Sequence, residues 1–149
     1  MIKVLFVCHG NICRSPIAEF IMKDLVKREG LSDQFEIASA ATSTEEIGNP
    51  VYPPARRILA EHGLSCSGKT ARQMTRRDLG YYDYIILMDL NNMRNVRWMF
   101  PNEELGNVRM LLPRNVADPW YTGNFEATWS DCVEGCTLLL EEIKENYGL

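Results

Sequence analysis

Short apolar runs alternate along the chain with longer segments of helical periodicity, and this alternation constrains the fold more than any other feature. Continuous apolar runs are typical of buried strands, whereas apolar residues three and four apart indicate helices. The strand-like runs cover residues 3–7, 34–40, 82–88 and 107–113. Helices are expected from Ser15 through the stripe Ile17, Phe20, Ile21 and Leu25, and over residues 55–61, 91–99 and 125–147. Strands that alternate with helices build parallel βαβ units, so we predict an α/β fold with helices on both faces of the sheet.

The length and charge of the chain argue against a multi-domain, a membrane-spanning or a nucleic-acid-binding protein. With 149 residues, 46% of them hydrophobic, the chain is long enough for one core, and we expect residues 1–149 to form a single domain. It has no apolar run of the ~18 residues that a membrane span needs, and no signal-peptide cleavage site follows its first strand-like run. The net charge is −4 and no Lys/Arg cluster exceeds a pair, which argues against a nucleic-acid partner. We therefore expect a cytoplasmic monomer that binds neither membranes nor nucleic acids.

The cysteines and histidines lack the spacing of a metal site. The chain has five cysteines, at positions 8, 13, 66, 132 and 136, without a CxxC pair, and only two histidines, His9 and His62. We therefore expect no metal ion and no other cofactor, and thiols kept reduced as they are inside cells. Cys132 and Cys136 lie on the apolar stripe of the last predicted helix, so we expect them to be core residues.

One segment combines a nucleophile with groups that attract anions. Residues 7–16, VCHGNICRSP, include the end of the first predicted strand, and ligands of open α/β sheets bind beyond the carboxyl ends of the strands. Ser15 suits a helix N-cap and Pro16 suits the first helical position. Backbone N–H groups, a guanidinium and a positive helix terminus would then surround a phosphate-like oxyanion. The predicted phosphate-binding loop comprises His9, Gly10, Asn11, Ile12, Cys13, Arg14 and Ser15.

The same surroundings would activate Cys8. A helix N-terminus and a nearby cation lower a cysteine pKa from ~8.5 to ~3.5–7.5, so that the nucleophilic thiolate is present near neutral pH. A thiolate beneath a bound phosphoryl group suits phosphoryl transfer through a cysteinyl-phosphate, with Arg14 and the amides stabilising the equatorial oxygens. The alternative is an inert buried cysteine beside a surface arginine, and the complete pattern CxxxxxRS after a strand argues against it.

A proton donor for the leaving group is expected in the segment DPWY, residues 118–121. Asp118 follows the last predicted strand, so it would lie at the same sheet edge as the Cys8 loop, where it could act as a general acid. The proline after it keeps the aspartate backbone extended, which would hold the carboxyl group in place. Trp120 and Tyr121 would wall a slot for an aromatic substrate. An ordinary turn with surface aromatic residues is the alternative.

Together these motifs resemble the low-molecular-weight protein tyrosine phosphatases. The resemblance rests on VCHGNICRSP, on SAAT after the second predicted strand, on ARQ, on YDYIILMDLNN and on DPWY, and it spans nearly the whole chain. It implies a three-layer sandwich with a four-stranded parallel sheet, and hydrolysis of phosphotyrosine in proteins and of aryl phosphates. It also implies that Cys8 is the nucleophile, Arg14 the phosphate clamp, and Asp118 the general acid and then the general base.

The resemblance implies further roles around the loop. Ser15 would hydrogen-bond the Cys8 sulfur, and Asn11 and Ser39 would brace the loop. Cys13 would form a protective disulfide with Cys8 under oxidation.

Several positions depart from the family pattern. His9 follows the nucleophile where the family has a small or apolar residue, and either tunes Cys8 or faces solvent. Glu45 replaces an aromatic wall of the slot, and an acidic wall would disfavour acidic peptides. Tyr52 stands where the family has an aspartate, and Lys69 or Gly68 stands in place of a histidine that supports the loop.

Three other functions remain open at this point. A thioredoxin-coupled arsenate reductase resembles this fold and loop, but it uses additional cysteines in a mobile segment and lacks the aspartic acid donor. A protein-arginine phosphatase typically has threonine before the second loop cysteine, where this chain has Ile12. A phosphopeptide-binding adaptor would bind the same phosphotyrosine-containing proteins without turnover.

Overall fold

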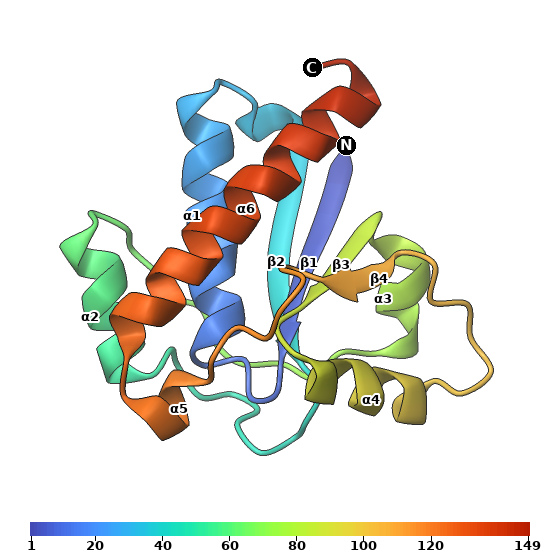
Figure 1. Ribbon diagram of the computed structural model, residues 1–149, viewed down its shortest axis with the longest axis horizontal. Helices are drawn as coiled ribbons and strands as arrows, with labels where there is room; N and C mark the ends of the chain where they lie inside the picture. The colour runs from blue at the N-terminus through green and yellow to red at the C-terminus, as the bar shows by residue number, and fades with distance from the viewer.

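The sheet of the computed structural model, which describes residues 1–149, has four parallel strands in the order β2-β1-β3-β4 (Figure 1). The strands are β1 (Ile2–Cys8), β2 (Phe35–Ala41), β3 (Tyr84–Leu87) and β4 (Val108–Met110). In the register, Val4 of β1 lies opposite Ile37 of β2 and Tyr84 of β3. The parallel sheet expected from the alternating sequence is therefore confirmed.

Six α-helices connect and follow these strands. They are α1 (Arg14–Arg28), α2 (Pro53–Glu61), α3 (Arg76–Tyr81), α4 (Leu90–Met99), α5 (Pro119–Thr122) and α6 (Phe125–Tyr147), with a short 3-10 helix, η1 (Ser32–Gln34). The sequence predicted α1, α2, α4 and α6, but neither α3 nor α5. Both of the unpredicted helices have six residues or fewer, so they carry no repeated apolar stripe that periodicity could detect.

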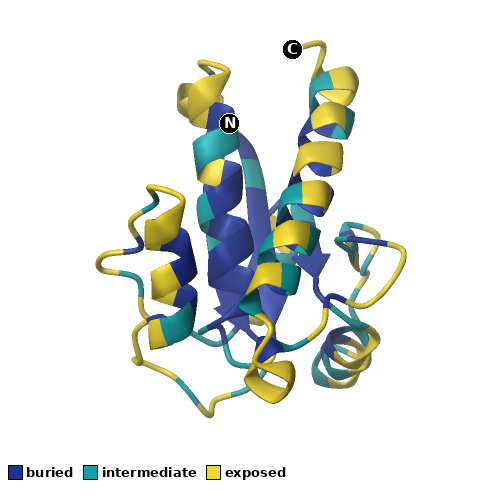
Figure 2. Cartoon of the chain, turned by 60° about the vertical axis from the view of Figure 1, so that its left-hand side comes forward, coloured by how far each residue is buried: buried dark blue, intermediate teal, exposed yellow.

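The two faces of the sheet have separate apolar cores. Val4 and Phe6 of β1 pack with residues of α1, α2 and α6, whereas Leu5 and Val7 pack with residues near α3 and α4. This separation follows from the alternation of side chains along a strand. Figure 2 shows the strands as the buried centre, with exposed residues on the outer sides of the helices. The expected helices on both faces are thus present.

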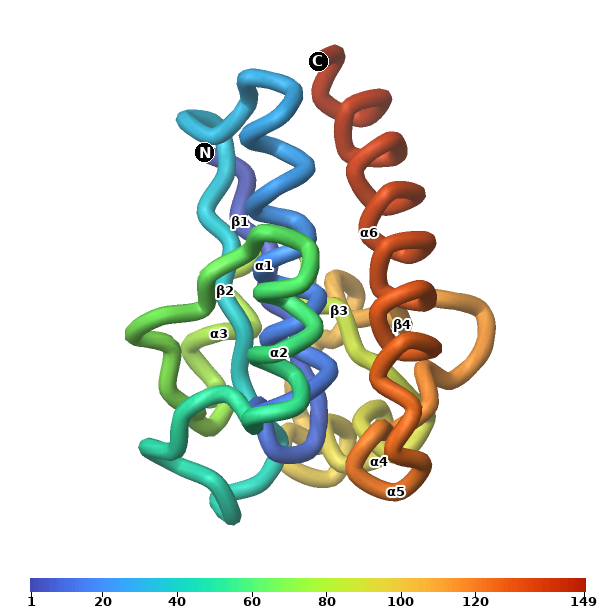
Figure 3. The backbone as a smooth tube through the Cα atoms, turned by 90° about the vertical axis from the view of Figure 1, so that its left-hand side faces the viewer, coloured from blue at the N-terminus to red at the C-terminus, as the bar shows by residue number.

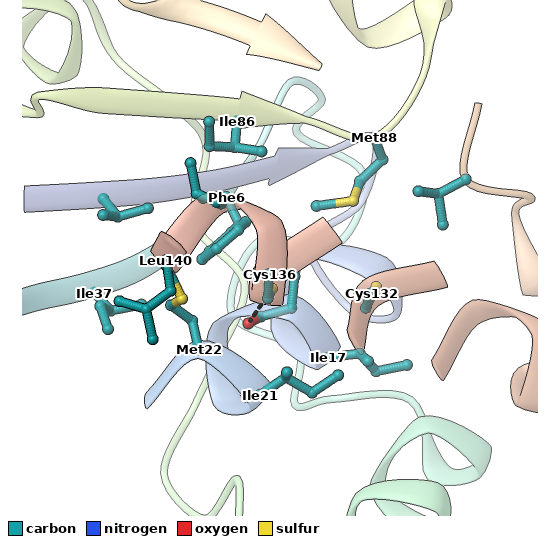
Figure 4. Packing of buried hydrophobic residues seen from close by; sticks show 14 of the residues in the cluster. Phe6, Ile17, Ile21, Met22, Ile37, Ile86, Met88, Cys132, Cys136 and Leu140 are labelled. Carbon is teal, nitrogen blue, oxygen red and sulfur yellow. Dashed lines mark hydrogen bonds between the residues drawn. The ribbon is translucent and has the colours of Figure 1, made fainter. Parts of the chain in front are cut away.

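The longest helix, α6, packs along α1 on one of these faces (Figures 1 and 3). Figure 4 shows Phe6 and Ile86 of the sheet facing Cys136 and Leu140 of this helix. Cys132 and Cys136 are completely buried, which confirms that they are core residues, and the Cys136 thiol donates to the carbonyl of Ala18 at 3.6 Å. None of the helices combines the length and the apolar character that a membrane crossing requires.

The start of α1 differs from the prediction. The helix begins at Arg14 with Cys13 as its N-cap, and the Cys13 carbonyl accepts the first helical hydrogen bond, from Ile17. Ser15 is therefore inside the first turn and caps nothing. Its hydroxyl contacts the sulfur of Cys8 instead. Local sequence preference would place this serine at the cap, but the contact with Cys8 places it inside the helix. Pro16 is tolerated there because the first-turn N–H groups lack helical partners in any case.

Candidate active site

The carboxyl ends of the strands meet at one edge of the sheet, and a pocket lies there. Figure 1 places the loop after β1, the loop after β2, the start of α4 and the short α5 at this same end. The pocket therefore draws on segments that are far apart in the sequence, as expected for an open α/β sheet. It is lined by Cys8, His9, Gly10, Ile12, Cys13, Arg14, Glu45, Glu46, Asp118, Trp120 and Tyr121.

Cys8 ends β1 at the bottom of this pocket, with only 3% of its surface exposed. The backbone N–H of Asn11 donates to its sulfur at 3.3 Å, and the Ser15 hydroxyl oxygen lies 3.0 Å from the same sulfur. The pocket therefore opens over a sulfur that the Asn11 N–H and the Ser15 hydroxyl hold in place.

The orientation of the Ser15 hydroxyl follows from the hydrogen bonds of Asn11. This residue has a φ of 60°, and its Oδ1 accepts the Arg72 backbone N–H, so its Nδ2 points the other way. Nδ2 donates to Ser15 Oγ at 2.8 Å and to Ser39 Oγ at 2.9 Å. Because Ser15 Oγ already accepts from Asn11, its own hydrogen is left to donate to the Cys8 sulfur.

A buried carboxylate anchors the far end of these hydrogen bonds. The Ser39 hydroxyl donates to Glu19 Oε1 at 2.5 Å, and Lys23 and Lys69 lie 2.7 and 3.9 Å from the same carboxylate. Lys69 also donates to the Ser39 carbonyl at 3.0 Å, and burial lowers its pKa below the usual lysine value. The sequence left open whether Lys69 or Gly68 stands in place of the family's supporting histidine. In the structure it is Lys69 that contacts Ser39 and Glu19. Glu19 was missed, because a glutamate inside an amphipathic helix gives no sequence signal.

Arg14 faces the pocket from the first turn of α1 and is 3% exposed. One nitrogen donates to Asp89 at 2.6 Å and to the Val116 carbonyl at 3.0 Å, and the other donates to Asp118 at 3.4 Å. Burial acts against the charge, but Cys8, Asp89 and Asp118 outweigh it and raise the pKa of Arg14. The guanidinium is therefore a fixed cation in the pocket.

Asp89 is a second site residue that the sequence analysis did not assign. It follows β3 and is the N-cap of α4, where it accepts the Asn92 backbone N–H at 2.7 Å. An acidic residue beyond the carboxyl end of a strand was the signal used for Asp118, and it applies equally to Asp89, which follows the strand-like run 82–88.

Asp118 lies beyond the last strand, at the same sheet edge as the Cys8 loop, and its carboxylate is beside Arg14. It is the N-cap of α5, and its Oδ1 accepts the Trp120 backbone N–H at 3.0 Å. The other oxygen, Oδ2, faces Arg14 in the pocket. The cap thus holds one carboxyl oxygen and leaves the other directed at the site of chemistry.

The pocket is also lined by exposed aromatic and acidic side chains. Trp120 and Tyr121 are 54% and 85% exposed. His9 Nε2 lies 2.9 Å from Glu45 Oε2, and both side chains are largely open to solvent. His9 therefore contacts Glu45 at the rim.

Cys13 also lines the pocket and carries a free thiol, as Cys8 does. Burial, reinforced by the neighbouring Cys8, raises the pKa of Cys13 to about 12. At neutral pH this thiol is therefore protonated and a weak nucleophile.

Comparison with known proteins agrees with this geometry. The family model described as low molecular weight phosphotyrosine protein phosphatase matches residues 3–148. The chain belongs to this family. A Bacillus subtilis relative, the low molecular weight protein-tyrosine-phosphatase YfkJ, is 41% identical over 156 residues that cover 100% of both chains. A relative from Rattus norvegicus named low molecular weight phosphotyrosine protein phosphatase is 39% identical over 94% of each chain.

Solved structures show that this phosphatase also shares the family fold. The crystal structure of Bacillus subtilis YfkJ superposes with a TM-score of 0.94, covering 98% of this chain and 96% of the other. The crystal structure of DARP, a Drosophila arginine phosphatase, superposes with a TM-score of 0.87 at 29% identity, covering 96% and 98%. The expected three-layer sandwich is thus confirmed. The phosphatase is an enzyme of the hydrolase class.

Proposed function

We propose that this phosphatase hydrolyses phosphotyrosine in proteins, and aryl phosphates generally, through a cysteinyl-phosphate on Cys8. The observation that carries the proposal is the meeting of Cys8, Arg14 and Asp118 in one pocket. A nucleophile held by hydrogen-bond donors, a fixed cation and a carboxyl group are the three parts that phosphoryl transfer to a protein side chain requires.

The reaction has two steps. In the first, the Cys8 thiolate attacks phosphorus, the bond from phosphorus to the tyrosine oxygen breaks, and Asp118 gives its proton to the departing oxygen. In the second, Asp118 takes a proton from water, the resulting hydroxide attacks phosphorus, and the sulfur–phosphorus bond breaks. Inorganic phosphate leaves, and Asp118 is protonated again for the next turnover.

The other residues of the pocket bind charge or the substrate ring. Arg14 and the backbone N–H groups of residues 9–15 hold the phosphoryl oxygens, and Ser15 stabilises the thiolate as it leaves the phosphoenzyme. Trp120, Tyr121 and Glu45 contact the aryl group and its peptide. Asn11 and Ser39 keep the loop in shape.

The proposal also covers the oligomeric state, location and cofactor requirement of the enzyme. Residues 1–149 act as one domain and as a monomer in the cytoplasm, on phosphotyrosine-containing proteins, without a metal ion or another cofactor. Arsenate reduction is disfavoured because Cys132 and Cys136, the spare cysteines of α6, are completely buried. An adaptor without turnover is disfavoured because it would not need the Asp118 carboxyl beside Arg14.

The test compares p-nitrophenyl phosphate with phosphotyrosine, phosphoserine and phosphoarginine peptides in the presence of a chelator. We expect turnover of the aryl phosphate and of phosphotyrosine, and little of the other two. Preferred turnover of phosphoarginine would assign the chain to the activity named for its Drosophila structural neighbour. Activity that required a divalent ion would contradict the proposed chemistry.

A further inference from the structure

The segment that carries Asp118 has few contacts of its own. Helix α5 has only four residues, and Tyr121 is almost fully exposed. The segment is held by the Asp118–Arg14 pair, by the Thr128 hydroxyl, which donates to the Ala117 carbonyl at 3.3 Å, by the buried Pro119 and by Trp120. The Trp120 side chain is about half exposed, so its position in the slot depends on the neighbour that covers its other side.

That neighbour is Tyr52. The ring centroids of Tyr52 and Trp120 are 4.8 Å apart at an interplanar angle of 53°, and the Tyr52 ring also lies 6.2 Å from Phe125, the first residue of α6. Such tilted and stacked arrangements are favourable beyond the apolar area that they bury. The Tyr52 ring thus bridges the acid segment and the start of α6.

The backbone of Tyr52 makes a separate contact with the loop that carries Cys8. Its N–H donates to the Ile12 carbonyl at 2.9 Å. Its ψ of 136° keeps it out of the helical region, which the following proline, Pro53 at the start of α2, disfavours. The backbone contact therefore leads to the Cys8 loop and the ring contact to the segment of Asp118, and a substitution that changes the side chain leaves the first of them intact.

We propose that Tyr52 is a positioning residue, whose ring holds Trp120 as a wall of the substrate slot and thereby holds Asp118 at its distance from the leaving group. The inference rests on the proposed function and adds to it a residue outside the pocket lining. Anion binding in the loop does not depend on this ring, whereas binding of an aryl group and proton donation do.

The kinetic experiment compares Tyr52→Ala with Tyr52→Phe, which keeps the ring. For Tyr52→Ala we expect KM for p-nitrophenyl phosphate to rise about 2- to 10-fold, the range that an aromatic pair contributes. The turnover of phosphotyrosine, whose leaving oxygen needs a proton, falls further than that of p-nitrophenyl phosphate. The inhibition constant of inorganic phosphate stays within about twofold, since each tenfold change would need about 1.4 kcal/mol of lost anion contacts.

Two comparisons decide whether the ring is responsible. Tyr52→Phe should match the wild type, and Trp98→Ala, which removes an exposed aromatic residue of α4, should do the same. If Tyr52→Ala weakens phosphate binding as much as aryl binding, Tyr52 merely supports the Cys8 loop and the proposal is wrong. If Tyr52→Phe is as impaired as Tyr52→Ala, the ring contact is not the cause and the proposal also fails.

A second measurement does not need activity. In a Trp98→Phe, Trp129→Phe background, Trp120 is the only fluorophore of its kind. We expect Tyr52→Ala to increase acrylamide quenching of Trp120, and unchanged quenching would overturn the proposal. Tyr52→Leu, which keeps apolar volume, replaces Tyr52→Ala if circular dichroism shows the alanine variant unfolded. An inactive wild type would refute the proposed function alone, because the fluorescence result would still test the contact.

Discussion

At the scale of single residues, Cys8 and Asp118 both lie beside Arg14 but have different proposed roles. Cys8 forms the bond to phosphorus, and Asp118 gives a proton to the leaving oxygen. We expect Cys8→Ser to reduce turnover to background, because a serine hydroxyl here has no adjacent base. Asp118→Asn keeps an oxygen to cap α5 and loses only the acidic proton. Since general acid catalysis contributes ~10²–10⁴-fold and matters most for basic leaving groups, Asp118→Asn should slow phosphotyrosine hydrolysis more than p-nitrophenyl phosphate hydrolysis.

The measurement for this prediction is single-turnover formation of the phosphoenzyme over a series of leaving groups. If the rate falls more steeply with leaving-group basicity in Asp118→Asn than in the wild type, the result supports proton donation by this residue. Equal losses over the whole series would mean that Asp118 only orders the segment.

Cys13 is expected to act as a resolving thiol. Its pKa of about 12 keeps it protonated, so peroxide oxidises Cys8 first, to a sulfenic acid. The Cys13 sulfur then displaces water from that sulfenic acid and forms a disulfide, which dithiothreitol reduces. In Cys13→Ser the sulfenic acid proceeds to the irreversible sulfinic acid, so recovered activity should fall severalfold. Equal recovery in both proteins would show that Cys13 only packs the loop.

At the scale of secondary-structure elements, the contact of α6 with the segment after β4 depends on a glycine. A Cβ added to Gly135 would lie 2.3 Å from Leu111 Cγ, so Leu111 or the helix must move. Alanine usually stabilises a helix interior by ~0.5–1 kcal/mol relative to glycine. Here we expect Gly135→Ala to destabilise instead, by about 1–3 kcal/mol, as overpacking does.

Gly80 provides the matched control within α3. A Cβ at this position meets nothing within 4 Å, so Gly80→Ala should show the usual gain of ~0.5–1 kcal/mol. Urea denaturation of the two variants measures both changes. A stabilising Gly135→Ala would show that Leu111 yields without cost.

At the scale of the whole molecule, buried thiols should lower the free energy of unfolding as the pH rises into the alkaline range. Burial raises the pKa of four thiols, those of Cys13, Cys66, Cys132 and Cys136, whereas in the unfolded chain they ionise near ~8.5. Above that pH the unfolded state holds fewer protons than the folded state, so stability falls as pH rises towards the folded values. Each thiol contributes a loss of about 1.4 kcal/mol per pH unit in this window.

Lys69 has the opposite effect, because burial lowers its pKa, but it is one group against four thiols. We expect the free energy of unfolding to drop by a few kcal/mol between pH 7 and pH 9.5, measured in urea with reductant present. In Cys136→Ala the drop should be about 1.4 kcal/mol smaller, whatever the cavity does to stability at pH 7. An unchanged pH dependence in this variant would contradict the explanation.

Prediction from sequence succeeded for the elements with long patterns. The last helix was expected over residues 125–147 and is observed as Phe125–Tyr147, because its apolar stripe repeats over many turns. The short helices α3 and α5 escaped detection. The N-cap at Ser15 was also wrongly assigned, since its hydroxyl makes a tertiary contact with the Cys8 sulfur that local preferences do not encode.

The local sequence was enough to predict that Cys8 ends the first strand and begins the phosphate-binding loop. A strand, a glycine-containing loop, an arginine and a helix start lie within ten consecutive residues, so their geometry is local. The distant groups that meet this loop could be identified only from the folded chain. Asp89 and Asp118 are 75 and 104 residues from Arg14, and the Tyr52 ring packs on Trp120 from a distant part of the sequence. Such contacts depend on the order of the strands and on helix packing, which no short segment of sequence specifies.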